Sequence, residues 1–304
     1  MSHPSDAAGP TGSAVIHDLG YRPYAGSRLG EGAIARSLYL TGLRHTYGLG
    51  RSARSKVLPM LLLGLMLLPA LILVGVLVQA RTILDLDEHL VAYSTYPITT
   101  QLLISVFVAA QAPALISRDL RFGTISLYLA RPLRRRSYVL VRLASLTVAT
   151  FVLVGAPLLV LYAGGVLADL PLGRETGRFL AALIGALLLA ACLSGLAALI
   201  SALTVRRGLA VAAVIIVLVI SYTVVSTIQG ISDDVGSESV GEVAGIFSPY
   251  TLVNGVQVFL FDSPAATATP PSTDAMGVLY LVATVLTIVG SSIAMLLRYR
   301  RVTA

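Results

Sequence analysis

Long runs of apolar residues constrain this chain more than any other feature of its sequence. Each run lacks Asp, Glu, Lys, Arg and His, and is about 20 residues long, the length that a helix needs to cross the ~30 Å hydrocarbon core of a bilayer. Six such runs are present, at about residues 57–79, 97–117, 143–167, 179–204, 208–228 and 276–297. Only 12% of the residues are charged, about half the fraction in soluble domains, which excludes a soluble enzyme and a disordered chain. The sequence therefore predicts an all-α polytopic membrane protein with six transmembrane helices.

The basic residues predict how these helices are oriented. Of the 22 basic residues, 19 lie before the first run, between runs two and three, between runs four and five, or after run six. Alternating spans would place all of them on one side of the membrane, together with only 4 of the 15 acidic residues. Arg81, Arg174 and Arg178 would face the other side. Cytoplasmic loops are enriched in Arg and Lys. We therefore expect a protein of the cell membrane (plasma or inner membrane) with both termini in the cytoplasm. The same distribution explains the high net charge without a nucleic-acid partner.

The segment before the first span divides into two parts. Residues 1–30 are rich in Ser, Gly, Pro and Ala, and we expect a disordered cytoplasmic tail. Residues 31–49 have a helical spacing of larger side chains, at Ile34, Leu38, Thr41, His45 and Leu49. We predict an amphipathic helix lying in the membrane interface. A cytosolic helix that packs on a partner is the alternative.

The longest segment on the predicted outer side, about 229–275, begins acidic and turns apolar at 246–261. Ser248-Pro249 is a helix-start signal, and Asn254-Gly255 is expected to interrupt the apolar stretch. A stretch this short cannot span the membrane. We therefore predict an extracellular re-entrant helical hairpin before the last span.

The loop between spans two and three, residues 118–142, has an unusual pattern for a linker. Gly123 and Thr124 form a break and an N-cap before a short apolar helix, which Pro132 ends. Four arginines, Arg131 and Arg134–Arg136, lie close together around this stop. They suit either an anchor at lipid headgroups or a docking element for a cytosolic protein. The apolar side chains of the short helix need a cover, which favours docking.

Several kinds of chemistry are not supported by the sequence. The phosphate-binding loop of ATPases needs a lysine after a glycine, and the one lysine, Lys56, follows a serine. ATP hydrolysis by this chain is therefore not expected. The four histidines are scattered, so we predict no metal site. A proton relay needs ionisable groups inside the spans, and the runs contain none. Cys192, within an apolar run, is expected to be a buried core residue.

Two of the predicted spans carry weakly polar faces. Gln101 and Ser105 share a face of the second span, and Tyr222, Ser226 and Gln229 follow helical spacing in the fifth. Such groups commonly form hydrogen bonds between helices or to their own helix backbone. The alternative is a path for an amphipathic substrate, with Gln101, Ser105, Tyr222 and Ser226 as its candidate lining.

Together these features resemble the permease subunit of a type-2 ABC exporter. Those proteins have an acid, Gly-Thr, a short apolar stretch, Pro and a basic residue after the second span. The matching residues here are Asp119, Gly123, Thr124, Leu127, Leu129, Arg131, Pro132 and Arg135. The acid is commonly Glu, so Asp119 departs from the pattern. Arg142 matches the basic residue that opens the third span.

The resemblance covers roughly residues 31–301 and implies one permease domain over residues 31–304. It implies two permease subunits, identical or homologous, and a cytosolic dimer of ABC ATPases that bind ATP and magnesium. The loop after span two would be the coupling helix, and the substrate would pass along spans two and five. This chain itself would be a transport subunit without a cofactor, not an enzyme. The alternative function is a non-transporting subunit, such as a sensor or an assembly scaffold.

Overall fold

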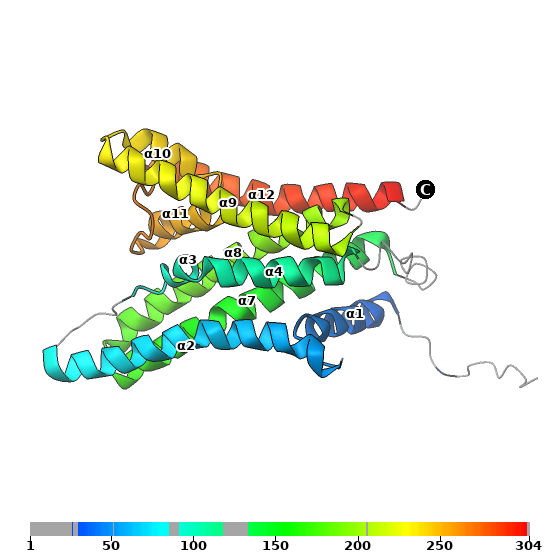
Figure 1. The fold of residues 1–304 in the computed structure, drawn as a ribbon, viewed down its shortest axis with the longest axis horizontal. Coiled ribbons are helices and arrows are strands. Elements are labelled where there is room, and N and C mark those ends of the chain that lie inside the picture. The colour runs from blue at the N-terminus through cyan, green and yellow to red at the C-terminus, as the bar shows by residue number, and fades with distance from the viewer. Residues whose placement is uncertain are drawn as a thin grey trace, which may run out of the picture.

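The computed structural model describes residues 26, 30–50, 52–84, 91–117, 133–204 and 206–302. In this part of the chain every regular element is a helix (Figure 1). The helices are α1 (Glu31–Thr46), α2 (Ala53–Leu84), α3 (Tyr96–Thr99), α4 (Gln101–Leu115), α7 (Arg135–Leu167), α8 (Leu172–Leu203), α9 (Arg207–Asp234), α10 (Glu238–Gly245), α11 (Pro249–Phe261) and α12 (Asp274–Val302). Apart from positions 26 and 30, the predicted tail lies outside the described residues.

Five helices, α2, α7, α8, α9 and α12, are long and apolar enough to cross a membrane. They cover the predicted spans one, three, four, five and six. Most extend beyond the apolar runs because flanking charged residues continue the helix: α7 begins at Arg135, and α12 passes through Arg298 and Arg300. The protein is therefore a multi-pass membrane protein, all-helical over its described residues, with five candidate spans, or six if the bent pair α10–α11 counts as one.

The predicted second span, 97–117, corresponds to α3 and α4. The helix is interrupted at Thr100, where the backbone leaves the α region (φ −102°, ψ 13°). The 15 residues of α4 extend about 22 Å at 1.5 Å per residue, less than the ~30 Å of the hydrocarbon core. A span here needs α3 as well, so the count of six spans stays a prediction.

Helix α4 lies at the centre of the bundle, in contact with α2, α7, α8 and α9. Ile104, Phe107, Val108 and Ala112 are fully buried. By contrast, α2 and α12 expose long apolar side chains along much of their length, such as Leu68, Leu71 and Leu286. A surface of this kind suits a hydrocarbon solvent. Cys192 is buried in the core, as predicted.

The long helices alternate in direction, and this brings the basic helix ends together. Figure 1 shows α1, the starts of α2, α7 and α9, and the end of α12 at one end of the bundle. We call this the basic end. Helices α10 and α11 lie at the opposite end, which we call the acidic end (Figure 1). The charge asymmetry read from the sequence thus becomes a structural asymmetry along the bundle axis.

Helix α1 packs against α7, but its buried face differs from the predicted one. The buried residues are Leu38, Gly42 and Thr46. Of the predicted stripe only Leu38 is buried, whereas Thr41 and Leu49 are exposed. A Cβ at Gly42 would contact the Ser145 hydroxyl at 2.7 Å, so a glycine permits the close approach of the two helices. The pattern of large side chains did not reveal this contact because small residues form it.

Helices α10 and α11 form a bent pair with an angle of 110°. The bend lies at residues 246–248, and α11 starts at Pro249 with Ser248 as its extended N-cap residue, as the sequence predicted. The interruption expected at Asn254-Gly255 is wrong, because α11 is continuous through both residues. Gly255 instead gives room for the ring of Tyr280 from α12.

Candidate functional site

A cluster of polar side chains lies where α4, α9 and α11 meet. The hydroxyls of Ser105 and Tyr250 are 2.7 Å apart, and the Tyr250 hydroxyl donates to the carbonyl of Gln101 at 3.0 Å. Because a tyrosine hydroxyl has one proton to donate, Ser105 must be the donor in its bond to Tyr250. Ser105 and Tyr250 are almost completely buried. We call Gln101, Ser105, Tyr222 and Tyr250 the Tyr250 cluster.

Tyr222 joins this cluster from α9. Its ring meets the Tyr250 ring edge-on, with centroids 6.0 Å apart and planes at 80°. Ser226 lies one turn further along α9 and donates to the carbonyl of Thr223 in its own helix at 3.1 Å. The structure therefore brings three of the four candidate path residues together and leaves Ser226 one turn away.

Tyr250 itself was missed by the sequence reading. The available signal was a tyrosine directly after the helix-start pair Ser248-Pro249, in an otherwise apolar stretch. A buried tyrosine usually needs a hydrogen-bond partner, which makes it a candidate bridge between helices. The partner could not be identified from spacing, because Ser105 lies 145 residues away.

We call the bent pair α10–α11 the hairpin; it carries Tyr250 and is fastened by bonds between distant segments. Thr251 donates to the carbonyl of Gly245 across the bend at 2.6 Å. Gln229 of α9 donates to the carbonyls of Gly241 and Thr269, at 3.3 and 3.2 Å. Tyr280 of α12 donates to the carbonyl of Glu242 at 2.5 Å. Gln229, on the polar face of the fifth predicted span, thus holds the hairpin.

An open cavity of about 620 Å³ lies at the acidic end, between the segment before α3, the first turns of α8 and the residues after α11. Arg174 and Arg178 line it. Beside it, the fully buried Glu175 accepts a hydrogen bond from the Tyr93 hydroxyl at 2.7 Å and lies 3.8 Å from Arg178. Burial and this carboxylate raise the pKa of Tyr93, so its phenol stays protonated and remains a donor.

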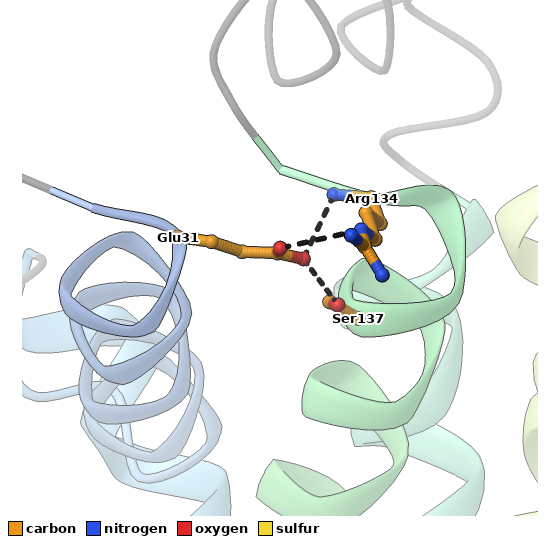
Figure 2. A network of polar contacts seen from close by, with 3 residues as sticks. All are labelled: Glu31, Arg134 and Ser137. Carbon is orange, nitrogen blue, oxygen red and sulfur yellow. Dashed lines mark hydrogen bonds and ion pairs between the residues drawn. The ribbon is translucent and has the colours of Figure 1, made fainter.

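At the basic end, Glu31 of α1 contacts the start of α7 (Figure 2). Its carboxylate accepts bonds from the Ser137 hydroxyl at 2.6 Å and from the backbone N–H of Arg134 at 3.1 Å. Nε of Arg134 is 3.6 Å from the other carboxylate oxygen. The Ser137 bond, the Arg134 N–H and the Arg134 charge together hold the pKa of Glu31 below its ordinary value. A negative charge also suits a helix N-terminus.

A family model described as "ABC-2 family transporter protein" matches residues 65–229, more than half of the chain. The chain belongs to the ABC-2 transporter family. No curated protein matches the sequence. The family match runs from within α2 to the end of the polar face of α9, and so includes the helices that carry Gln101, Ser105 and Tyr222. ABC-2 permeases are generally non-catalytic membrane subunits that work with an ATPase partner.

Most of the permease's predicted coupling residues lie outside the described residues. These are Asp119, Gly123, Thr124, Leu127, Leu129, Arg131 and Pro132. Arg135 is described and is the exposed first residue of α7, in the turn that Glu31 contacts. Arg142 is buried in α7, and its guanidinium lies 5.5 Å from the centroid of the Tyr138 ring. Among the described residues, no group of three or more His, Cys, Asp or Glu side chains is arranged to hold a metal ion.

Proposed function

We propose that this permease is the membrane-spanning subunit of an ATP-driven exporter that moves an amphipathic substrate across the plasma membrane. The family match over residues 65–229 carries this proposal, because permeases of this family generally act with an ATPase. ATP and magnesium would bind to that partner, and no cofactor would bind to this chain. A second permease subunit, identical or homologous, would complete the complex.

The proposed topology has six spans, with α3 and α4 together as the second. Helix α1 would lie in the cytoplasmic interface, and the bent pair α10–α11 would enter the membrane from outside and return. The bend of 110° supports a re-entrant hairpin, since α11 has only 13 residues. Both termini would be cytoplasmic, because the positive-inside rule places the basic end there. The permease domain would comprise residues 31–304.

Coupling would occur at the basic end, through the segment from Asp119 to Arg135. The apolar residues Leu127 and Leu129 would contact the ATPase, and Asp119 and Arg135 would fix the angle of docking. The contacts of Glu31 with Ser137 and Arg134 support this, because they join α1 to the turn that follows the segment. A displacement of that turn would therefore reach α1 and α7 together.

The Tyr250 cluster would lie along the substrate path. Its hydroxyl bonds connect α4 to α11, and the ring contact of Tyr222 with Tyr250 adds α9. These are the elements that must separate if the path opens beside spans two and five. Hydrogen bonds between membrane helices average about 0.6 kcal/mol, so such a cluster is weak enough to be broken in a transport cycle. In this proposal the helix bundle has two states, and ATP binding at the partner would shift the equilibrium between them.

The test is substrate-stimulated ATP hydrolysis by the permease reconstituted with its ATPase. Tyr222→Ala with Ser226→Ala should change the stimulation more than Thr284→Ala with Thr287→Ala in α12. The pairs are comparable because Ser226, Thr284 and Thr287 each donate to a carbonyl of their own helix. Tyr250→Phe, which keeps the ring, should resemble the first pair. Equal effects of both pairs of substitutions would show that the Tyr250 cluster only packs helices together and does not line a path. If no candidate substrate changes the rate of ATP hydrolysis, the alternative function, a non-transporting sensor or assembly scaffold, would be favoured.

A further inference from the structure

A groove at the basic end borders the proposed coupling segment, since Arg134 and Arg135 belong to both, but its α12 side has no role in the function proposed above. It lies between the start of α7 and the end of α12, which meet where the rings of Tyr138 and Tyr299 are 5.9 Å apart. Its volume is about 650 Å³, and Leu133, Val139 and Tyr299 form a buried, largely apolar floor. The groove is therefore large enough for a phosphate with part of its attached chain.

The rim of this groove is strongly positive. Arg135 and Arg136 from α7 and Arg300 from α12 are exposed and line it, together with Arg134, which is paired with Glu31. None of the described residues that line it is acidic. Guanidinium groups bind phosphate through paired hydrogen bonds at fixed geometry. Arg135, Arg136 and Arg300 line one rim from two helices, and together they suit a phosphate better than a carboxylate-bearing side chain, which would leave donors unused.

An exposed apolar stripe leads along α12 to this rim. Ile293, Leu297 and Arg300 have i, i+4, i+7 spacing and so share a helix face. Leu286, Ile293 and Leu297 are 64%, 50% and 50% exposed. On α7, Arg136 is followed four residues later by Leu140, which is 51% exposed. Each helix thus presents an arginine directly beyond apolar surface of the kind that contacts lipid chains.

We propose that this groove binds the phosphate of an anionic phospholipid, with an acyl chain lying along the α12 stripe. Arg136 and Arg300 would hold the phosphate from the two helices, and the apolar floor would cover the glycerol region. A soluble phosphate would find the same arginines but would gain nothing from the stripe. The arrangement therefore favours a lipid from the leaflet at the basic end, and a lipid there would join α7 to α12.

The experiment measures lipid retention by the purified permease in detergent, using native mass spectrometry with dioleoyl phosphatidylglycerol. Arg136→Gln with Arg300→Gln should weaken binding by about tenfold or more, since each basic residue near an anionic surface contributes roughly 1 kcal/mol. Arg206→Gln with Arg207→Gln is the matched control: it removes two exposed arginines from the same end, before α9. These two arginines are the N-cap residue and the first residue of α9. The control should bind as the unchanged permease does. Arg136→Lys with Arg300→Lys should retain part of the binding.

Three results would overturn the proposal. Equal weakening of lipid binding in the groove variant and the control would show that the lipid is attracted to the basic end in general and not bound in the groove. Displacement of the lipid by inorganic phosphate at similar concentrations, or equal binding of dihexanoyl and dioleoyl phosphatidylglycerol, would show a site for a soluble phosphate. Unchanged lipid binding with loss of the partner ATPase in the groove variant would make the groove a protein contact. A lower affinity for phosphatidylcholine than for phosphatidylglycerol is part of the expected result.

Discussion

Single polar residues in this permease connect helices that are far apart in sequence. Glu31 of α1 bonds to the N–H of Arg134, the N-cap residue of α7, and to the hydroxyl of Ser137 in its first turn. Tyr250 performs a similar role between the hairpin and α4. Neither contact is visible in hydropathy, because each depends on one side chain reaching a particular partner. Removal of such a residue is therefore expected to loosen a contact between helices without preventing membrane insertion.

The pH dependence of amide protection, compared between the unchanged permease and Glu31→Gln, tests the contact of Glu31 with α7. The folded-state pKa of Glu31 lies below its ordinary value of 4.5. Its stabilising effect is thus complete above that value and is lost as the pH falls through the lower, folded-state pKa. Intrinsic amide exchange slows as the pH falls, so the quantity to compare is protection relative to the intrinsic rate. At the start of α7 this protection should fall on that acid side in the unchanged permease. In the variant, exchange should already be faster at neutral pH and should lack this step.

Glu238→Gln is the control for that experiment, since Glu238 also lies in the first turn of a helix but at the acidic end. It should leave exchange in α7 unchanged. Equal exchange in Glu31→Gln and the unchanged permease would show that the carboxylate does not stabilise this turn.

Most residues of the Tyr250 cluster could be predicted from the sequence, and the contacts that were missed were missed for a physical reason. Gln101, Ser105 and Tyr222 were recognised because polar groups inside an apolar run are costly unless they have partners. Gln229 was placed on the same face, but it holds the hairpin, since spacing identifies a face and not what covers it. Gly42 was missed because a close helix contact needs a small residue, which carries no hydropathy signal.

At the scale of elements, hydropathy predicts where the long helices lie but not where they begin and end. The five long helices lie where the apolar runs predicted them, yet α7 begins well before its run because arginines are good helix formers. The bend before α11 was signalled by Ser248-Pro249. The continuity of α11 through Asn254-Gly255 was not, because the contact with Tyr280 outweighs the low helix propensity of both residues.

Gly255→Ala tests this packing of α11 on α12. A Cβ there would overlap the Tyr280 ring and approach Pro271, both stiff groups. Overpacking of this kind costs about 1–3 kcal/mol, so the thermal unfolding midpoint in detergent should fall. Gly230→Ala in α9 is the matched control, since nothing lies within 4 Å of its added Cβ. It should be neutral or raise stability by up to about 1 kcal/mol. Equal midpoints for the two variants would mean that α11 and α12 do not pack as described.

For the whole molecule, the separation of basic and acidic ends determines which surfaces meet which compartment. This asymmetry was readable from the sequence, because loop charge needs no tertiary information. The central position of α4 was not, since every predicted span is apolar enough to face lipid and only packing distinguishes a core helix from a lipid-facing one. The orientation in the membrane decides whether the segment before α7 can meet a cytosolic ATPase at all.

Cysteine labelling tests that orientation. Single cysteines at positions 12, 135 and 302 should resist an impermeant thiol reagent in intact cells and react after permeabilisation, whereas one at 238 should react in both. The native Cys192 is buried and should not contribute. Positions 135 and 238 are the first residues of α7 and α10, and the start of α7 and helix α10 lie at opposite ends of the bundle (Figure 1). Labelling of position 135 from outside would reverse the orientation and remove the basis for coupling there.

The central claim is that a partner ATPase drives this permease through the segment after α4, and co-purification tests it most directly. Leu127→Asp with Leu129→Asp places charges in the proposed contact, where an unpaired buried charge is strongly unfavourable. Val235→Asp with Val240→Asp makes the same change at two valines of the acidic end that are 74% and 54% exposed. We predict that the first variant inserts normally but loses the ATPase and transport, while the second keeps both. Wild-type recovery of the ATPase with full transport in the Leu127 and Leu129 variant would contradict the account.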